Sequence, residues 1–449
     1  MSTGVRRTAA PVLTGAPASA ELGRFAEALR PGVMGPRLAH ALDGRTRTCH
    51  VLDAKFEPGV RATVLYEYAG GWVRGDLVPD GEVPDGSTGR AGGPGRAPVL
   101  APGLRISVFP EDPDLPSLPR VMDPAYLGPA LAESLWDTTR PDTSRRGVRC
   151  RSTLIRYRPG RRVTLRVDFV GRAGAYVAKV YHDSRKAAAV VAEAPALADH
   201  AGGCDTLRIP ATAGHLPEDA VVVQEAVSGV PLEALLGCSL ATSGGAVAAA
   251  EALVRAARAL AELHQMSPAT ARVRSVDAEV ERFARRAAGV AGVEPRTGDA
   301  LSRLAARLRT TQQDLPGAVA GTVHGDCKPN QMLLDHQRVL LMDLDHVAVS
   351  DQAMDVGTFL ASLRQLPLRR PGTGPSRPSP VLSALRDTFL ASYLEARGDD
   401  TMLARIGWQE AAALERKALR AWARAPGAPM AHALVREGES CLDRLSRTP

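Results

Sequence analysis

The amino-acid sequence predicts an α+β fold, in which a small antiparallel sheet precedes a mostly helical region and an additional α/β region lies N-terminal to both. Three observations predict it. Apolar and polar residues alternate in three successive segments of 152–181, which is typical of an antiparallel sheet. A hairpin pattern lies between 321 and 357. In other segments, such as 246–265, apolar residues recur at helical spacing and predict amphipathic helices.

The chain begins with a polar stretch, which an α/β region follows. Residues 1–19 are small, polar and contain proline, so we expect them to be disordered. Residues 20–137 are expected to form an accessory N-terminal region. Its predicted helices are 20–29 and 126–136, and its predicted strands are 48–56, 62–68, 72–78 and 105–109. The Gly- and Pro-rich residues 79–104 predict a mobile loop, and the prolines of 110–124 predict an extended segment without helix.

Two further regions follow the accessory region. Residues 138–235 are expected to contain strands at 152–158, 163–169, 175–181 and 220–225, with a helix over 184–194. Residues 236–449 are expected to be mostly helical, with a loop over 366–380, where Pro and Arg are frequent and periodicity is lost. The helices are predicted over 246–265, 276–291, 299–313, 381–396, 401–425 and 430–446. The hairpin segment 321–357 lies among them.

Composition excludes several classes of protein. The chain has 449 residues, of which 45% are hydrophobic, enough for a sizeable core. No apolar run reaches the ~18 residues of a membrane helix, and the N-terminus lacks a secretory pattern, so we expect no membrane partner. The six cysteines are scattered, which fits reduced thiols and a cytoplasmic location. The net charge of +7 comes from arginines spread along the chain, and aromatic residues make up only 4%, so we expect no nucleic-acid partner.

The segment 321–357 carries the candidate chemistry. Two short apolar runs flank a polar turn, which is a hairpin pattern. Asp326 and Gln331 precede the hairpin, and Asp343 and Asp345 follow it, so the strand ends would project these side chains to one place. Carboxylate and amide oxygens suit Mg²⁺, and a further carboxylate nearby could orient an attacking hydroxyl.

These residues resemble a known family. His324-Gly325-Asp326, followed by Pro329 and by Asp343 about 17 positions after Asp326, resembles the aminoglycoside phosphotransferase and choline kinase group. That group consists of small-molecule kinases with a protein-kinase-like fold. The resemblance implies a bilobal molecule with an N-lobe over 138–235 and a helical C-lobe over 236–449. It also implies that Asp326 is the catalytic base, that Asp343 is the main Mg²⁺ ligand, and that His324 braces the catalytic loop.

The expected metal site departs from the family at one position. The family's metal-binding Asn, five residues after the base, is Gln331 here, and Asn330 lies one residue earlier. Both side chains offer a carbonyl oxygen, so Gln331 is the expected ligand and Asn330 the alternative, and Asp345 is also assigned to the metal site. Asp351 and Asp355 match the family's spacing and would hold the loop against the C-terminal helices.

Lys179 is the expected ligand of the nucleotide phosphates. It lies in the apolar strand 175–181, where burying an ammonium group without an anionic partner is costly. In kinase-like folds the third-strand lysine pairs with phosphates and with a helix glutamate, and Glu193 is the candidate glutamate. Val177 shares the strand face of Lys179 and is assigned to the nucleotide site. A lysine whose tip reaches water is the structural alternative.

The remaining nucleotide contacts fall on one turn and one strand end. No GxGxxG motif is present, and a Pro-Gly turn that contains Arg161 and Arg162 occupies its place. These two arginines would hold phosphates or would simply be solvated turn residues. The strand 220–225 and the Gly-x-Pro-Leu sequence after it resemble the family's hinge. This implies that Gln224, Glu225 and Val227 lie at the adenine, with backbone hydrogen bonds from 225–227.

An internal repeat also involves the Pro-Gly turn. Pro58-Gly59-x-Arg61-x-Thr63 recurs as Pro159-Gly160-x-Arg162-x-Thr164. In the first copy Gly75 is expected where Lys179 lies in the second. The repeat therefore predicts an accessory sheet without nucleotide chemistry that packs beside the N-lobe sheet, unless two common Pro-Gly turns coincide by chance.

The resemblance implies an ATP-dependent phosphotransferase that acts on a hydroxyl of a small molecule: a sugar, an aminoglycoside or an amino alcohol. ATP and Mg²⁺ are the implied cofactors, and the oligomeric state stays open. A protein kinase is one alternative, because Lys328 follows Asp326 as in the catalytic loop of those enzymes and could reach the γ-phosphate. A nucleotide-binding pseudokinase scaffold is the other, because the glycine-rich loop and the metal-binding Asn are missing.

Overall fold

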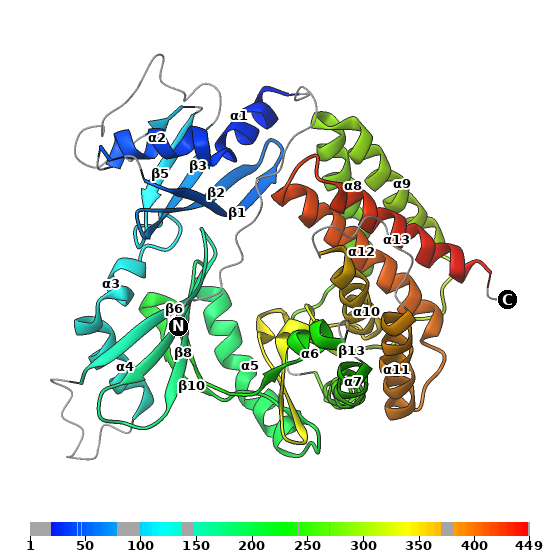
Figure 1. Ribbon diagram of the computed structural model, residues 1–449. Coiled ribbons are helices and arrows are strands. Elements are labelled where there is room, and N and C mark those ends of the chain that lie inside the picture. Colours follow the sequence, from blue (N-terminus) through cyan, green and yellow to red (C-terminus); the bar gives the residue numbers. More distant parts are fainter. Residues whose placement is uncertain are drawn as a thin grey trace.

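The computed structural model contains two five-stranded antiparallel sheets, two smaller sheets and a helical C-terminal half (Figure 1). It describes residues 19–447 apart from 43, 46, 79–98, 102, 137–147, 240–242, 269 and 370–379. The predicted disorder of 1–18, most of the predicted loop 79–104 and the boundary between 137 and 138 therefore lie outside the described residues. The predicted α+β arrangement, with its additional N-terminal sheet, is confirmed.

The N-terminal region is a sheet covered by two helices, α1 (Ala20–Ala28) and α2 (Pro31–Leu42). The strand order is β1-β2-β3-β5-β4, and all neighbours are antiparallel. The strands are β1 (Cys49–Glu57), β2 (Arg61–Tyr68), β3 (Gly71–Leu77), β4 (Val99–Leu100) and β5 (Leu104–Val108). The four predicted strands of this region are confirmed, and β4 was not predicted.

The proline-rich run 110–124 is not wholly extended, so that prediction was wrong. The short helix α3 (Leu118–Met122) lies within it, and α4 (Pro124–Leu135) follows directly. Pro119 and Pro124 stand in the first turns of these helices. Backbone N–H groups there have no partner within the helix, so proline removes no hydrogen bond.

The second sheet lies between helices on both faces. Its strands, in the order β10-β11-β8-β7-β6, are β6 (Cys150–Arg158), β7 (Arg162–Phe169), β8 (Ala175–Tyr181), β10 (Thr212–Leu216) and β11 (Val221–Glu225). The helix α5 (Ser184–Gly202) packs on one face through Ala187 and Val190. On the other face, Leu118 of α3 and Leu127 and Leu131 of α4 join the apolar cluster of β6–β8.

The helix α5 continues through Pro195, eight residues past its predicted end at Ala194. A proline inside a helix removes one backbone hydrogen bond. Leu197 and Ala201, which follow it, are buried in the apolar cluster of the C-terminal half. Burial of the last turns therefore offsets the local cost of the proline.

The C-terminal half consists of helices around two small sheets. The helices are α6 (Leu232–Ser239), α7 (Ser243–Gln265), α8 (Val276–Val293), α9 (Pro295–Gln312), α10 (Ala353–Leu368), α11 (Pro380–Arg397), α12 (Leu403–Arg424) and α13 (Pro429–Leu445). One sheet has the order β12-β14-β15-β9, with strands β12 (Val230–Pro231), β14 (Met332–Asp335), β15 (Arg338–Leu341) and β9 (Leu207–Arg208), and the other pairs β13 (Ala320–Val323) with β16 (Ala348–Asp351). The predicted hairpin is β14–β15. The predicted loop 366–380 is helical as far as Leu368, where α10 ends, and 370–379 lie outside the described residues.

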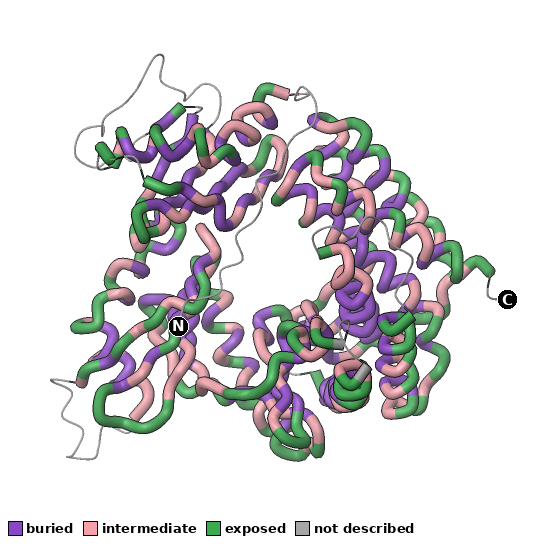
Figure 2. The backbone as a smooth tube through the Cα atoms, in the orientation of Figure 1, coloured by how far each residue is buried: buried purple, intermediate pink, exposed green. Residues whose placement is uncertain are grey.

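The N-terminal sheet contacts the second sheet and also the helical C-terminal half. The sequence did not indicate the contact with the helices. Phe56 of β1 stacks on Phe25 of α1 with ring centroids 4.9 Å apart, and lies 5.7 Å from Trp422 of α12. One continuous apolar cluster contains α1, α2 and β1–β5 together with α8, α9, α12 and α13. Figure 1 shows β1 beside one end of α12, and Figure 2 shows buried residues along both elements. The accessory region therefore joins the two halves of the molecule.

A buried carboxylate fixes the N-terminal region to the Pro-Gly turn of the second sheet. Asp112 accepts hydrogen bonds from the Tyr157 hydroxyl at 2.7 Å and from the Gly160 N–H at 2.8 Å, and it pairs with Arg74 of β3. Gly160 has a φ of +62°, and a Cβ there would lie 2.2 Å from Nη2 of Arg61. The turn thus needs glycine for its backbone conformation and for this close approach.

The internal repeat matches the paired strands, with one correction. Both Pro-Gly turns join antiparallel strands, β1 to β2 and β6 to β7. Thr164 pairs with Lys179, whereas its counterpart Thr63 pairs with Asp76. Asp76, and not Gly75 as predicted, therefore stands where Lys179 stands in the second sheet. Asp76 accepts a hydrogen bond from Thr63 at 2.6 Å.

Among the helices that the structure describes, none is long and apolar enough to cross a membrane.

The contact between Phe56 and Trp422 predicts cooperative unfolding of the whole chain. Phe56→Ala and Trp422→Ala should each lower the free energy of unfolding by about 3–5 kcal/mol, because both rings are buried. Denaturant unfolding of the two single variants and the double variant should give a coupling energy above about 0.5 kcal/mol. Val60→Ala is the control, because Val60 is 79% exposed. Additive effects, or two separate unfolding transitions, would show that the N-terminal region is an independent domain.

Glu415 of α12 predicts a loss of stability as the pH rises. Its side chain is buried, and neither carboxylate oxygen has a hydrogen-bond partner among the described residues, so burial raises its pKa well above the usual value. The unfolded chain ionises this group above about pH 4.3, so the folded state loses stability as the pH rises beyond that value. We expect Glu415→Met to raise the melting temperature at pH 7.5 and to raise it less at pH 5. The exposed Glu395→Met is the matched control, and equal shifts at both pH values would contradict the assignment.

Candidate active site

The catalytic loop that follows β13 is held by the buried carboxylate of Asp355. The Gly325 N–H donates to Asp355 at 2.9 Å, the His324 N–H donates to its other oxygen, and His264 lies 3.2 Å away. Burial acts to raise the pKa of Asp355, but the hydrogen bond and charge of His264 and the contacts of His324 outweigh it and lower that pKa. His264 also lies 2.7 Å from the Tyr393 hydroxyl. Asp355 therefore holds the backbone of the loop at His324 and Gly325, and His264 is packed between Asp355 and Tyr393.

Asp326 lies at the tip of this loop beside Lys328. Lys328 Nζ donates to Oδ2 of Asp326, and Arg420 of α12 lies 3.9 Å from Oδ1. Burial acts to raise the pKa of Asp326, but the two cations outweigh it and lower that pKa to about 2. The carboxylate is therefore ionised at neutral pH and can accept a hydrogen bond from a hydroxyl. The loop thus places Lys328 next to Asp326, which is the position that the protein-kinase alternative assigned to this lysine.

The second group of site residues lies where β15 ends. Asp343 has a φ of +61°, which turns the chain into the short helix that contains Asp345. Lys179 of β8 lies 3.3 Å from Asp343 and 3.2 Å from Asp345, and the Tyr181 hydroxyl donates to Asp345 at 2.8 Å. Arg162 of β7 also pairs with both carboxylates. These ion pairs thus connect β7 and β8 of the second sheet to the C-terminal half.

The two carboxylates fit a divalent cation. Burial acts to raise the pKa of Asp343 and of Asp345, but Lys179 and Arg162 outweigh it, so both pKa values lie below the usual range. Both carboxylates are therefore ionised, and both contact Lys179 and Arg162. Across the described residues, no cluster of three or more His, Cys, Asp or Glu side chains could hold a metal ion. The residues present suit Mg²⁺ that takes its other ligands from phosphates and water, as is usual for this ion.

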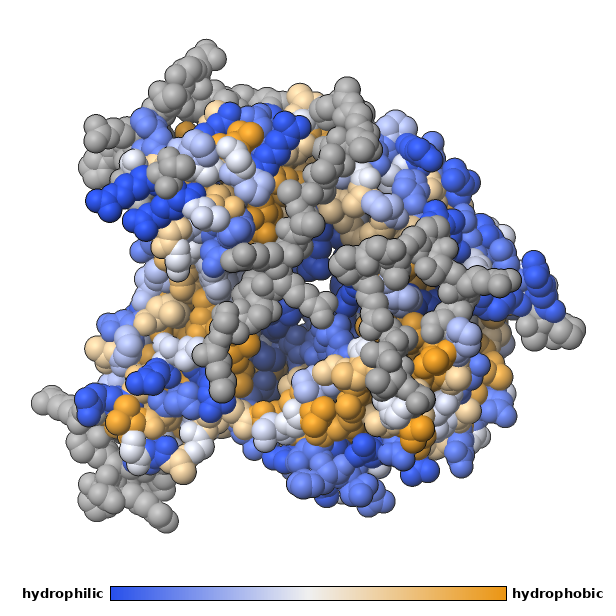
Figure 3. All heavy atoms as spheres, viewed as in Figure 1, coloured by the Kyte–Doolittle hydropathy of each residue, from blue (hydrophilic) through white to orange (hydrophobic). Residues whose placement is uncertain are grey.

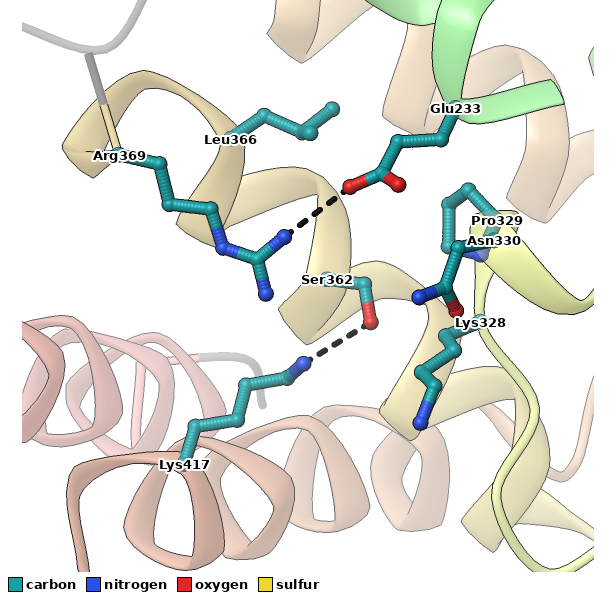
Figure 4. Close-up of a pocket in the computed structure, with 8 residues that line it drawn as sticks. All are labelled: Glu233, Lys328, Pro329, Asn330, Ser362, Leu366, Arg369 and Lys417. Carbon is teal, nitrogen blue, oxygen red and sulfur yellow. Dashed lines mark hydrogen bonds and ion pairs between the residues drawn. The ribbon is translucent and has the colours of Figure 1, made fainter. Parts of the chain in front are cut away.

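Of the two amides considered for the metal site, only Gln331 lies beside Asp343. Its Nε2 donates to Oδ2 of Asp343 at 3.3 Å. Asn330 is exposed and lines a different pocket with Ser362 and Lys417 (Figure 4). An amide that donates its N–H to Asp343 can turn its carbonyl oxygen to a cation bound there. The geometry thus favours Gln331 over Asn330 as the amide ligand.

The expected pair between Lys179 and Glu193 is not formed. Glu193 accepts a hydrogen bond from the Thr270 hydroxyl at 2.6 Å and lies 3.5 Å from Arg272. Among the residues that the structure describes, Lys179 pairs with Asp343 and Asp345 instead. Thr270 and Arg272, which follow α7, thus provide the partners of the Glu193 carboxylate. Periodicity could not reveal this contact, because the segment after α7 has no regular pattern.

The arginines of the Pro-Gly turn have different positions. Arg162 points inward, and its side chain is only 11% exposed. Arg161 is exposed, and its carbonyl oxygen accepts a hydrogen bond from the His182 N–H at 3.2 Å. Arg162 therefore lies in the site, and the solvated interpretation fits Arg161.

The predicted hinge lies at the end of β11 next to β8. Gln224 pairs with Val177, and Glu225 pairs with Tyr176, in an antiparallel register. The N–H groups of Glu225 and Ala226 donate to the carbonyl oxygens of Ala211 and Ala175, at 2.9 and 3.0 Å. The Val227 N–H has no hydrogen-bond partner within the described part of the chain. Of the three predicted N–H donors, Val227 is thus the one that can still bind an adenine edge.

Two arginines near the site were missed by the sequence analysis. Arg272 donates to the carbonyl oxygen of Asp345 at 3.0 Å, and Arg274 donates to that of Gly325 at 2.6 Å. They connect the loop at Gly325 and the turn at Asp345 to the segment between α7 and α8. That segment has neither a motif nor a periodic pattern, so only the fold shows their place.

Figure 3 shows hydrophilic residues deep in the hollow between the sheets and the helical half.

Comparisons with known proteins give a family and a set of similar structures. The model described as the phosphotransferase enzyme family matches residues 159–414. No curated protein matches the sequence. Among solved structures, a choline kinase from Cryptosporidium parvum Iowa II is 11% identical with a TM-score of 0.49, over 72% of this chain and 97% of that one. A choline/ethanolamine kinase family protein from Mesorhizobium loti is 15% identical with a TM-score of 0.43, over 66% and 89%.

A third similar structure extends over more of this chain. A glucosamine kinase in complex with glucosamine, ADP and inorganic phosphate is 18% identical with a TM-score of 0.44, over 92% of this chain and 97% of that one. The family match alone decides the classification, because it covers more than half of the sequence and includes Lys179, Asp326 and Asp343. The predicted resemblance and the kinase-like fold are thus confirmed, and the chain belongs to the phosphotransferase enzyme family.

Proposed function

We propose that the protein transfers the γ-phosphoryl group of ATP to a hydroxyl of a small molecule, with Asp326 as the base. The observation that carries the proposal is that the ionised Asp326 and the pair Asp343 and Asp345 all interact electrostatically with His346, so the three carboxylates lie near one another. Phosphoryl transfer depends on positioning and charge stabilisation more than on covalent chemistry. Asp326 would position the acceptor hydroxyl, and Asp343 and Asp345 would hold the metal ion that stabilises the charge on the phosphates.

The nucleotide would lie against the second sheet. Val177 and Val227 would bound the adenine, and Lys179 and Arg162 would turn from the carboxylates to the phosphates. Asp343, Asp345 and Gln331 would hold Mg²⁺, which when bound neutralises charge on the phosphates. Asp326 would accept the proton of the acceptor hydroxyl while Lys328 offsets negative charge beside it.

A protein kinase is less well supported. The chain passes from Asp343 through one short helix and β16 directly into α10, which begins at Ala353. This span leaves little room for the activation segment and peptide platform of a protein kinase. A pseudokinase scaffold remains the second candidate, because Arg162 already pairs with both carboxylates that would bind the metal. Release of ADP that depends on an acceptor separates an enzyme from a scaffold.

Asp326→Asn tests the base. The amide cannot take a proton, so kcat should fall by about 10²-fold or more with any acceptor that the wild type phosphorylates. The affinity for MgATP should stay within about threefold, because Asp326 acts on the acceptor and not on the nucleotide. The exposed Asp387→Asn on α11 is the matched control. Wild-type turnover by Asp326→Asn would assign the base to another residue.

Asp343→Ala and Gln331→Ala test the metal site by calorimetric titration of ATP with and without Mg²⁺. We expect Asp343→Ala to abolish the gain in affinity that Mg²⁺ provides, because a full charge is lost. Gln331→Ala should reduce that gain less, because only a carbonyl dipole is removed. Asn330→Ala should leave the gain unchanged. If Asn330→Ala reduces it and Gln331→Ala does not, the two amide assignments are reversed.

A further inference from the structure

A small pocket lies beside the catalytic loop. It has a cavity volume of about 20 Å³ and is formed by α6, the catalytic loop, α10 and α12 (Figure 4). Its polar side chains come from all four elements: Glu233, Lys328, Asn330, Ser362, Arg369 and Lys417. We call it the lysine pocket. It adjoins the base, because Lys328 lines the pocket and also contacts Asp326.

Lys417 is the cation in this pocket that no carboxylate neutralises. Its Nζ donates to the Ser362 hydroxyl at 3.0 Å and lies 3.4 Å from Oε1 of Gln365. Within the described residues it has no carboxylate partner. Burial, followed by the charges of Lys328, Arg369 and other nearby arginines, lowers its pKa to about 7. A buried ammonium group without an anion is costly, and an anionic ligand would remove that cost.

The other cations of the lysine pocket are paired. Arg369 lies 3.0 Å from Glu233, and Lys328 pairs with Asp326. Arg420, one turn beyond Lys417 on α12, is 54% exposed and lies 3.9 Å from Asp326. Two acids therefore face four cations between the pocket and the base. The excess positive charge lies where an acceptor would have to bind.

We propose that the lysine pocket binds an anionic group of the acceptor, so that the substrate is a hydroxyl compound with a carboxylate or a phosphate. This proposal rests on the proposed function, since it takes Asp326 as the base. Lys417 would pair with the anion, and the amide of Asn330 would donate a hydrogen bond to it. A hydroxyl elsewhere on the same molecule would then lie at Asp326. A polycationic acceptor would instead meet like charge on α10, α12 and the catalytic loop.

A panel of acceptors of one size tests the charge preference. Gluconate, glucose 6-phosphate, glucose and glucosamine should each be assayed for ADP release by the full-length protein with MgATP. We expect kcat/KM for at least one of the two anionic compounds to exceed that for glucose by about tenfold or more, with glucosamine lowest. The preferred compound of the two distinguishes a carboxylate from a phosphate. Glucose or glucosamine as the best acceptor would overturn the proposal.

Variants of Lys417 test the pocket itself. Lys417→Met should raise KM for the preferred anionic acceptor by about tenfold or more and leave kcat within about threefold, because only binding is lost. Lys417→Arg should restore most of the affinity, and KM for glucose should not change. Lys55→Met, in the N-terminal sheet, is the matched control. If Lys417→Met melts below the assay temperature, Arg369→Gln is measured instead, with the same expected rise in KM. An equal effect of the variant on anionic and neutral acceptors would contradict the proposal.

Binding measurements separate this inference from the proposed function. If the wild type phosphorylates none of the compounds, the proposed reaction fails for this acceptor class. Calorimetric titration of gluconate and glucose 6-phosphate into the MgADP complex still tests the lysine pocket. Binding by the wild type that is lost in Lys417→Met supports the pocket. Absence of binding, or equal binding by both proteins, overturns it.

Discussion

Four buried or nearly buried charges join the two halves of this protein. Lys179 and Arg162 come from neighbouring strands of the second sheet, and Asp343 and Asp345 follow β15. Burying such charges is costly unless each is paired. Separating the second sheet from the C-terminal half would therefore leave these charges without their partners. The same carboxylates are those that suit a metal ion, so the contact that closes the structure also prepares the site.

The accessory region adds a second constraint on the same sheet. Asp112 binds the turn at Gly160 two residues before Arg162, and Trp72 stacks on Tyr157 with ring centroids 6.0 Å apart. The opposite side of the region packs on Trp422. A glycine-rich loop is mobile in many nucleotide-binding proteins, whereas this turn is fixed from outside by a buried carboxylate. The N-terminal sheet thus helps to fix the position of Arg162 beside Asp343 and Asp345.

Cations are unevenly distributed around the base. Lys328 and Arg420 lie beside Asp326 and Lys417 lies in the lysine pocket, whereas Lys179 and Arg162 are matched by the carboxylates of Asp343 and Asp345. A site for polyamines needs acidic side chains around the acceptor, because like charges repel at short range. The family as such does not fix the acceptor. In the proposed reaction, its choice would depend on side chains of α10 and α12 that carry no motif.

The sequence by itself determined the family and most of the strands and helices, and it singled out Asp326, Asp343, Gln331 and Lys179 as candidate site residues, because these depend on local periodicity and on short spacings within one segment. Only the tertiary structure decided the partners of those residues. Glu193 bonds to Thr270 rather than Lys179, and Arg162 reaches Asp343 across 181 positions. It also decided that Lys417 faces the catalytic loop and that Phe56 meets Trp422. Contacts between distant segments depend on how whole elements pack, and no local pattern encodes that arrangement.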